Sequence, residues 1–253
     1  MENTTGYVKA ELHHGVTHIE FFSPQGNSLP LRLLEELATA IHAAGIDPDT
    51  KVILLKSPGD VFCAGASFNE LAAITTKEEG LRFFSGFAAV INAMRHCPRL
   101  IIGRIHGKCV GGGVGIAAAV DYAIAVEPAE IKLSELSVGI GPFVVGPAVE
   151  RKIGLSAFTQ LAIDAGMWRN SEWARRKGLF AEVHPTTDSM DESIARLLNN
   201  LSHSSVEAMA ELKKVAWAGT EHWDELLETR AAISGRLVLG EQSRAAIAAF
   251  IKK

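Results

Sequence analysis

The order of hydrophobic and polar positions near the start of the chain changes from the period of a strand to the period of a helix. Residues 7–12 and 16–22 are rich in β-branched and aromatic side chains and flank the short turn His13-His14-Gly15, so they predict a β-hairpin. Apolar residues then recur at helical spacing over residues 33–41, and Ser28 precedes them as the expected helix cap. The pattern therefore predicts two strands followed by a helix.

Short apolar runs continue this alternation along the chain. Residues 51–56 and 100–105 predict buried strands, because each is an apolar run bounded by turn residues. Between them, Ser67–Glu70 and Thr76–Glu79 have the S/T-x-x-E form of a capping box, and each predicts the start of a helix. The second of these helices is expected to end at Pro98, because proline cannot continue a helix.

Helical patterns dominate the last third of the chain. From Pro147 onward they are interrupted by one predicted strand, at residues 179–183. Alternating strands and helices followed by helices alone predict the α/β class, with a helical C-terminal region. We place the division near residue 190, which gives a core over 1–190 and a helical region over 191–253.

The composition of the chain argues against several classes of function. With 253 residues, 47% of them hydrophobic, the chain can bury a large core, and its formal net charge of -4 gives no support for a nucleic-acid groove or an anionic-membrane surface. The three cysteines, Cys63, Cys97 and Cys109, form no C-x-x-C pair, and no H-E-x-x-H motif is present, so no metal is expected. No apolar run is long enough to span a membrane, and we expect a cytoplasmic protein.

Two glycine-rich loops carry the strongest chemical signal. They lie at residues 62–71 and 106–115, and each leads into a predicted helix. Small residues let a ligand approach the backbone, and the unpaired N–H groups of a helix N-terminus favour negative charge on an oxygen atom. The pair of loops could therefore form an oxyanion hole. The alternative for the triple glycine 111–113 is tight packing between a helix and a strand.

The sequences of these loops resemble a known family. Phe62-Cys-Ala-Gly-Ala66 and Gly111-Gly-Gly113 look like the two signature segments of the enoyl-CoA hydratase/isomerase (crotonase) family, and the similarity extends from the opening hairpin to Ala249-Phe250. The resemblance implies a spiral of ββα units over 1–190 and a helical trimerisation region over 191–253. It also implies an acyl-CoA thioester substrate, no cofactor apart from the coenzyme A of that substrate, and a homotrimer or a dimer of trimers.

The resemblance also assigns binding residues. The backbone N–H groups of Ala66 and Gly112 match the two positions that bind the thioester oxygen, and Gly111 lies in the same turn. Phe250 matches an aromatic residue that, together with lysines such as Lys252 and Lys253, reaches the nucleotide of a neighbouring subunit; the alternative is a frayed basic tail. The strip that lines the adenine and pantetheine channel is matched by Ala64, Ala66, Phe68 and Leu71.

One acidic residue remains as the acid/base candidate. Family members that hydrate a double bond use two glutamates, but this chain has Gly115 at the first position and retains only the second, Glu135. Residues 133–143 around Glu135 are mostly apolar, so desolvation should move its pKa toward neutrality. The alternative is a structural role, in which Glu135 caps the turn at Ser137 or pairs with a surface cation.

A single carboxylate favours a 1,3-proton shift over the addition of water. The stretch Gly139–Phe143 also resembles Δ3,Δ2-enoyl-CoA isomerases, which work with one glutamate, so isomerisation is the leading hypothesis. An enoyl-CoA hydratase with altered machinery and a glutaconyl-type decarboxylase are alternative activities. The alternative from another class is a catalytically silent binding or scaffold protein with the same fold.

Overall fold

Two sheets of mostly parallel strands form the centre of the protein. The computed structural model describes residues 5–251. The first two strands are an antiparallel hairpin, as predicted, and the other neighbours in the six-stranded sheet are parallel. In spatial order, that sheet contains β1 (Tyr7–His13), β2 (Val16–Phe22), β3 (Val52–Lys56), β5 (Leu100–Ile105), β7 (Tyr122–Val126) and β10 (Glu182–His184). The four-stranded sheet contains β4 (Val61–Cys63), β6 (Lys108–Val110), β8 (Glu130–Lys132) and β9 (Arg169–Asn170).

The order of the strands along the chain makes a spiral. Each of the pairs β3–β4, β5–β6 and β7–β8 places its first strand in the large sheet and its second in the small sheet. A helix follows each pair: α2 (Phe68–Ala73) with α3 (Lys77–His96), then α4 (Gly112–Ala119), then α5 (Gly146–Ile163) after the 3₁₀ turn η1 (Glu135–Val138). The α/β class and the expected spiral of ββα units are confirmed.

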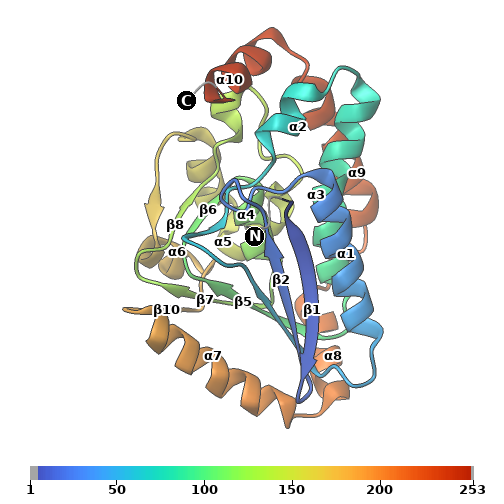
Figure 1. The fold of residues 1–253 in the computed structure, drawn as a ribbon, viewed down its shortest axis with the longest axis vertical. Helices are drawn as coiled ribbons and strands as arrows, with labels where there is room; N and C mark the ends of the chain where they lie inside the picture. Colours follow the sequence, from blue (N-terminus) through green and yellow to red (C-terminus); the bar gives the residue numbers. More distant parts are fainter. Residues whose placement is uncertain (1–4, 252–253) are drawn as a thin grey trace.

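Helices cover the large sheet on both faces. The helix α1 (Leu31–Ile46) packs against β1, β2 and α3, whereas α7 (Thr187–Ser202) packs against β3, β7 and β10. Figure 1 shows α7 across the large sheet from α1 and α3. The strands β3 and β5 are buried along nearly their whole length, as expected for parallel strands covered on both sides.

The C-terminal helices fold back over the core. They are α6 (Ser171–Lys177), α8 (Val206–Ala216), α9 (Trp223–Leu237) and α10 (Glu241–Ile251). The helix α9 lies along α3, and α10 contacts α2 and η1 (Figure 1). The predicted helical character of this region is confirmed. The division at 190 falls within α7, and the role of the region in trimerisation stays a prediction.

The start of α1 differs from the sequence-based expectation. The helix begins at Leu31 after Pro30, and Ser28 does not cap it. Instead the backbone N–H of Leu31 donates to Oε2 of Glu70, at 2.7 Å. Ser67 does cap α2 as predicted, but the Glu70 carboxylate has turned to α1 and does not complete that capping box. An acceptor from a distant segment has therefore replaced the local cap, at the positive end of the α1 dipole.

No helix within residues 5–251 combines the length and the apolar composition that a membrane crossing requires.

Candidate active site

The two glycine-rich loops meet because the strands before them are neighbours. The strands β4 and β6 pair in parallel, with Cys63 opposite Cys109, so the loops leave the same edge of the small sheet. A Cβ added to Gly65 would lie 2.5 Å from the carbonyl oxygen of Val110 and 3.1 Å from the nitrogen of Gly112. The two loops are therefore in direct backbone contact.

At this junction the backbone N–H groups of Ala66 and Gly112 have no acceptor among the described residues. Leu29 bridges to the loop on one side, where it donates to the carbonyl of Gly65 and accepts from the N–H of Ser67. This alternation turns the N–H of Ala66 to the other side. Gly112 is the first residue of α4, where helix geometry leaves N–H groups unpaired. Two free donors at one place can bind an oxygen atom that gains negative charge.

Close contacts explain the glycines at this junction. A Cβ at Gly112 would overlap the ring of Phe87. Gly111 has a backbone φ of 52°, which residues other than glycine rarely adopt. The same hypothetical atom at Gly111 would lie 3.1 Å from Oε1 of Glu135. Tight packing and free amides therefore occur together here, so the two interpretations of the triple glycine do not exclude each other.

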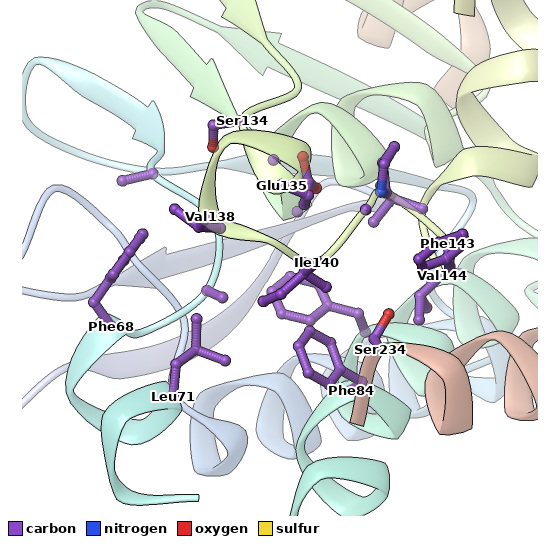
Figure 2. Close-up of a pocket in the computed structure, with 18 residues that line it drawn as sticks. Phe68, Leu71, Phe84, Ser134, Glu135, Val138, Ile140, Phe143, Val144 and Ser234 are labelled. Carbon is purple, nitrogen blue, oxygen red and sulfur yellow. The ribbon is translucent and has the colours of Figure 1, made fainter. Parts of the chain in front are cut away.

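A cavity of about 60 Å³ lies beside the junction. Figure 2 shows the side chains that enclose it, which come from both loops, α3, η1 with the residues on either side of it, and α9. Seven of the predicted site residues line it, namely Ala64, Ala66, Phe68, Leu71, Gly111, Gly112 and Glu135. Eleven more lining residues were not predicted from the sequence, which are Phe84, Phe87, Ser134, Val138, Ile140, Gly141, Pro142, Phe143, Val144, Val145 and Ser234.

The carboxylate of Glu135 is enclosed and lacks a charged partner. Although the residue as a whole is half-buried, Oε2 is buried and has no hydrogen-bond partner among the described residues. Burial raises the pKa of Glu135 from its ordinary 4.5 to about 7, and a hydrogen bond from its own backbone N–H opposes part of this rise. A carboxyl group with such a pKa can exchange protons at neutral pH.

The structural roles considered for Glu135 do not agree with these contacts. The turn at Ser137 is held by hydrogen bonds to the carbonyl of Ser134, one from the Ser137 hydroxyl at 2.6 Å and one from its backbone N–H. Neither bond uses the Glu135 carboxylate. Among residues 5–251, no lysine, arginine or histidine forms an ion pair with it or lines the cavity.

A second carboxylate has no room at Gly115. A Cβ on Gly115 would lie 2.5 Å from the Cβ of Val145. Val144 and Val145 occupy the adjoining wall of the cavity, and Glu135 is the one charged residue among the described lining residues. The cavity thus presents a single acid/base group opposite an apolar wall.

Phe250 lies outside the lining of the cavity. Its ring stacks on Phe68 of the same chain, with the ring centroids 4.0 Å apart. Phe250, which lies at the end of α10, therefore contacts a residue that lines the cavity. More than half of the surface of Phe250 is exposed. Lys252 and Lys253, which the resemblance suggested as contacts for the nucleotide of a neighbouring subunit, lie outside the described residues.

The cysteines beside the loops are not set up as nucleophiles. Cys63 and Cys109 are both fully buried and unpaired. Burial raises the pKa of Cys63 to about 12 and holds that of Cys109 well above its ordinary value. Since the thiolate is the reactive form, these side chains act as small apolar residues in the core.

Comparison with known proteins points to one family. The family model described as enoyl-CoA hydratase/isomerase matches residues 11–252. A peroxisomal Delta(3,5)-Delta(2,4)-dienoyl-CoA isomerase of Arabidopsis thaliana is 26% identical, over 90% of this chain and 86% of its own length. The human mitochondrial methylglutaconyl-CoA hydratase is 32% identical, over 68% of this chain and 51% of its own length. The crystal structure of enoyl-CoA hydratase from Bacillus halodurans superposes with a TM-score of 0.88, at 23% identity, over 96% of this chain and 99% of that one.

Proposed function

Since this chain belongs to the enoyl-CoA hydratase/isomerase family, we propose that it is an enzyme that moves the double bond of an acyl-CoA thioester from the β,γ to the α,β position. This is the reaction of a Δ3,Δ2-enoyl-CoA isomerase. The observation that carries the proposal is the single enclosed carboxylate of Glu135, which lies beside two free backbone amides and faces an apolar wall.

In the proposed mechanism, the N–H groups of Ala66 and Gly112 hold the thioester carbonyl oxygen. Glu135, as the carboxylate, takes a proton from the α carbon, and the electron pair of that C–H bond moves into a dienolate whose negative charge rests on the held oxygen. Glu135, now protonated, returns the proton to the γ carbon, and the double bond forms between the α and β carbons. An oxyanion-hole donor of this kind contributes about 2.7–4 kcal/mol to the lowering of a barrier.

The pKa of Glu135 suits both halves of this transfer. A carboxyl group with a pKa of about 7 is a stronger base than one with the ordinary value of 4.5, and it still loses its proton readily at neutral pH. The reaction consumes no oxidant, reductant or metal. We therefore propose that no cofactor is needed apart from the coenzyme A that the substrate carries.

The structural support for isomerisation over hydration comes from the position of Gly115. Water addition in this family uses a second glutamate there, and the contact between Gly115 and Val145 leaves no space for one. The relatives bear names of both kinds, an isomerase and a hydratase, so identity alone does not choose between them. The side chains of Val144 and Val145, which occupy this wall, also supply no second carboxylate that could activate an attacking water.

A decarboxylase and a silent scaffold fit the site less well than an isomerase. A glutaconyl-type substrate would bring a second carboxylate into a cavity whose described lining has no cation to pair with it. A silent scaffold would gain nothing from the buried Glu135 carboxylate or from unpaired amides, each of which lowers stability. The enzyme proposal accounts for all of these groups together.

We propose a homotrimer or a dimer of trimers as the assembly, in the cytoplasm. Four large apolar side chains are more than half exposed on α5 and α8, as expected for surfaces that a neighbouring copy covers: Leu155, Ile163, Leu212 and Val215. The cysteines of the described chain are all unpaired thiols, in keeping with a reducing compartment.

The proposal is tested by incubating the purified protein with 3-pentenoyl-CoA and, separately, with 2-pentenoyl-CoA. Conjugation of the 3-enoyl ester at unchanged mass, with kcat/KM rising as the pH passes through about 7, is the expected result. Glu135→Gln should abolish this activity, and Glu228→Gln, at an exposed position on α9, should retain it. Addition of water to the 2-enoyl ester without any isomerisation would overturn the proposal in favour of a hydratase.

A further inference from the structure

The cavity contains a polar side chain that the proposed proton transfer does not use. Ser234 lies on α9, is only 1% exposed, and lines the cavity. Figure 2 shows its hydroxyl directed away from the α9 ribbon, toward the space between Ile140 and Val144. The C-terminal helical region therefore contributes directly to a site that is otherwise built from the core.

A close contact between two helices places Ser234 there. A Cβ added to Gly80 on α3 would lie 2.5 Å from the carbonyl oxygen of Gly235 on α9, so the two backbones touch. Larger residues at either glycine would force the helices apart. Because Ser234 directly precedes Gly235, this contact holds its side chain beside Phe84, another residue of α3 that lines the cavity.

The surroundings of Ser234 are apolar. The nearby lining consists of hydrocarbon and aromatic side chains, such as Phe84, Phe87 and Val144, and the hydroxyl of Ser234 forms no hydrogen bond with any residue of the described chain. A hydroxyl in such a place lowers stability unless a partner arrives with a ligand. An oxygen atom on the acyl group would be such a partner.

Charge and size restrict that acyl group further. Glu135 is the one charged side chain in the described lining, and no lysine, arginine or histidine is among those residues, so a carboxylate at the acyl end would be desolvated and repelled. The cavity measures only about 60 Å³, which suits a short acyl group and not a long chain. The site fits a short, uncharged acyl group.

We propose that the substrate is a short acyl-CoA with an uncharged acyl end, whose carbonyl or hydroxyl oxygen forms a hydrogen bond with Ser234. This inference rests on the proposed binding of a thioester between Ala66 and Gly112. It makes Ser234 a specificity-determining residue, because a plain hydrocarbon end leaves its hydroxyl unpaired and an oxygenated end satisfies it.

The test compares three saturated CoA esters of nearly the same shape, which bind without reacting. They are 4-methylpentanoyl-CoA, 4-oxopentanoyl-CoA, in which a carbonyl oxygen replaces a methyl group, and succinyl-CoA, in which a carboxylate replaces the acetyl end. Dissociation constants are measured by calorimetry for the wild type and Ser234→Ala. The matched control is Ser202→Ala, which removes a buried serine of α7 whose hydroxyl donates to the carbonyl of Asn199.

The two uncharged esters are expected to respond differently to the loss of the hydroxyl. Ser234→Ala should weaken the binding of 4-oxopentanoyl-CoA by roughly three- to tenfold, which corresponds to the loss of one hydrogen bond. The binding of 4-methylpentanoyl-CoA should be unchanged or tighter. Ser202→Ala should change neither affinity. Succinyl-CoA should bind the wild type at least ~100-fold more weakly than 4-oxopentanoyl-CoA, because its charge loses water without gaining a partner.

The inference would be overturned if Ser234→Ala changed the dissociation constants of the two uncharged esters equally. It would also be overturned if the wild type bound succinyl-CoA as tightly as 4-oxopentanoyl-CoA, or did not bind 4-oxopentanoyl-CoA at all. The proposed isomerisation is judged separately by the conjugation of 3-pentenoyl-CoA. A protein that distinguishes the saturated esters as expected but does not move the double bond would refute the proposed reaction and leave the specificity inference standing.

Discussion

The replacement Glu135→Gln should make the protein more stable at neutral and alkaline pH while it removes the proposed activity. Burial raises the pKa of the carboxyl from 4.5 to about 7 in the folded protein, so folding opposes its ionisation. The two values differ by about 2.5, and one pKa unit corresponds to about 1.4 kcal/mol, which gives about 3 kcal/mol for the cost of keeping the charged form buried. Glutamine resembles the protonated acid in shape and carries no charge.

The stability gain has a defined pH window. Below pH 4.5 the carboxyl is protonated in both the folded and the unfolded chain, so the free energies of unfolding of the variant and the wild type should be similar. Between pH 4.5 and about 7 the unfolded chain has lost the proton and the folded chain has kept it, so the wild type loses stability relative to the variant as the pH rises. Above about 7 the difference should stay constant.

Urea unfolding at roughly pH 4 and pH 8.5, at one fixed protein concentration, measures this difference. The control Glu228→Gln changes an exposed carboxylate of α9 and should shift the free energy of unfolding by less than about 0.5 kcal/mol at either pH. A glutamine variant that is no more stable than the wild type at the higher pH would refute the reasoning. It would mean that the carboxylate is solvated or paired in a way that the described contacts do not include.

Two further substitutions test the local geometry. Gly115→Glu should not produce a hydratase, because the new side chain meets Val145; we expect a loss of roughly 1–3 kcal/mol in the free energy of unfolding, measured in urea, and no addition of water to 2-pentenoyl-CoA. Glu70→Ala should cost roughly 0.5–2 kcal/mol, because the N–H of Leu31 at the start of α1 loses its acceptor, and Glu70→Gln, which retains a side-chain oxygen, should recover much of this loss in the same assay.

Local patterns in the sequence predicted most elements of the fold. The strand predicted at 100–105 has those same bounds in β5, and the capping box of Thr76 and Glu79 opens α3 as expected. Both depend on neighbouring residues, which a sequence displays directly. The cap predicted at Ser28 is wrong for the opposite reason, since the acceptor at the start of α1 comes from Glu70, 39 positions away. A distant side chain with a full negative charge competes successfully with a local hydroxyl.

The same distinction applies to the candidate site. The sequence indicated both glycine-rich loops and Glu135, because each has a signature within a few residues. It gave no sign of Ser234 or Val145, which reach the cavity through contacts between α3 and α9 and between α4 and α5. A serine and a valine in helical regions have no local pattern that distinguishes a wall of a cavity from ordinary packing. Only the path of the chain in space assigns them to the site.

Four polar groups around this one cavity are unpaired. The amides of Ala66 and Gly112, Oε2 of Glu135 and the hydroxyl of Ser234 have no partners within the described chain, although their surroundings are apolar. Each group lowers the stability of the protein by itself, and none supports the fold. A thioester oxygen, a transferable proton and an oxygenated acyl end would give partners to all four. These four groups, each of which makes the fold less stable, are therefore the ones through which we propose that the protein acts, and a purely structural role for the chain would leave them without explanation.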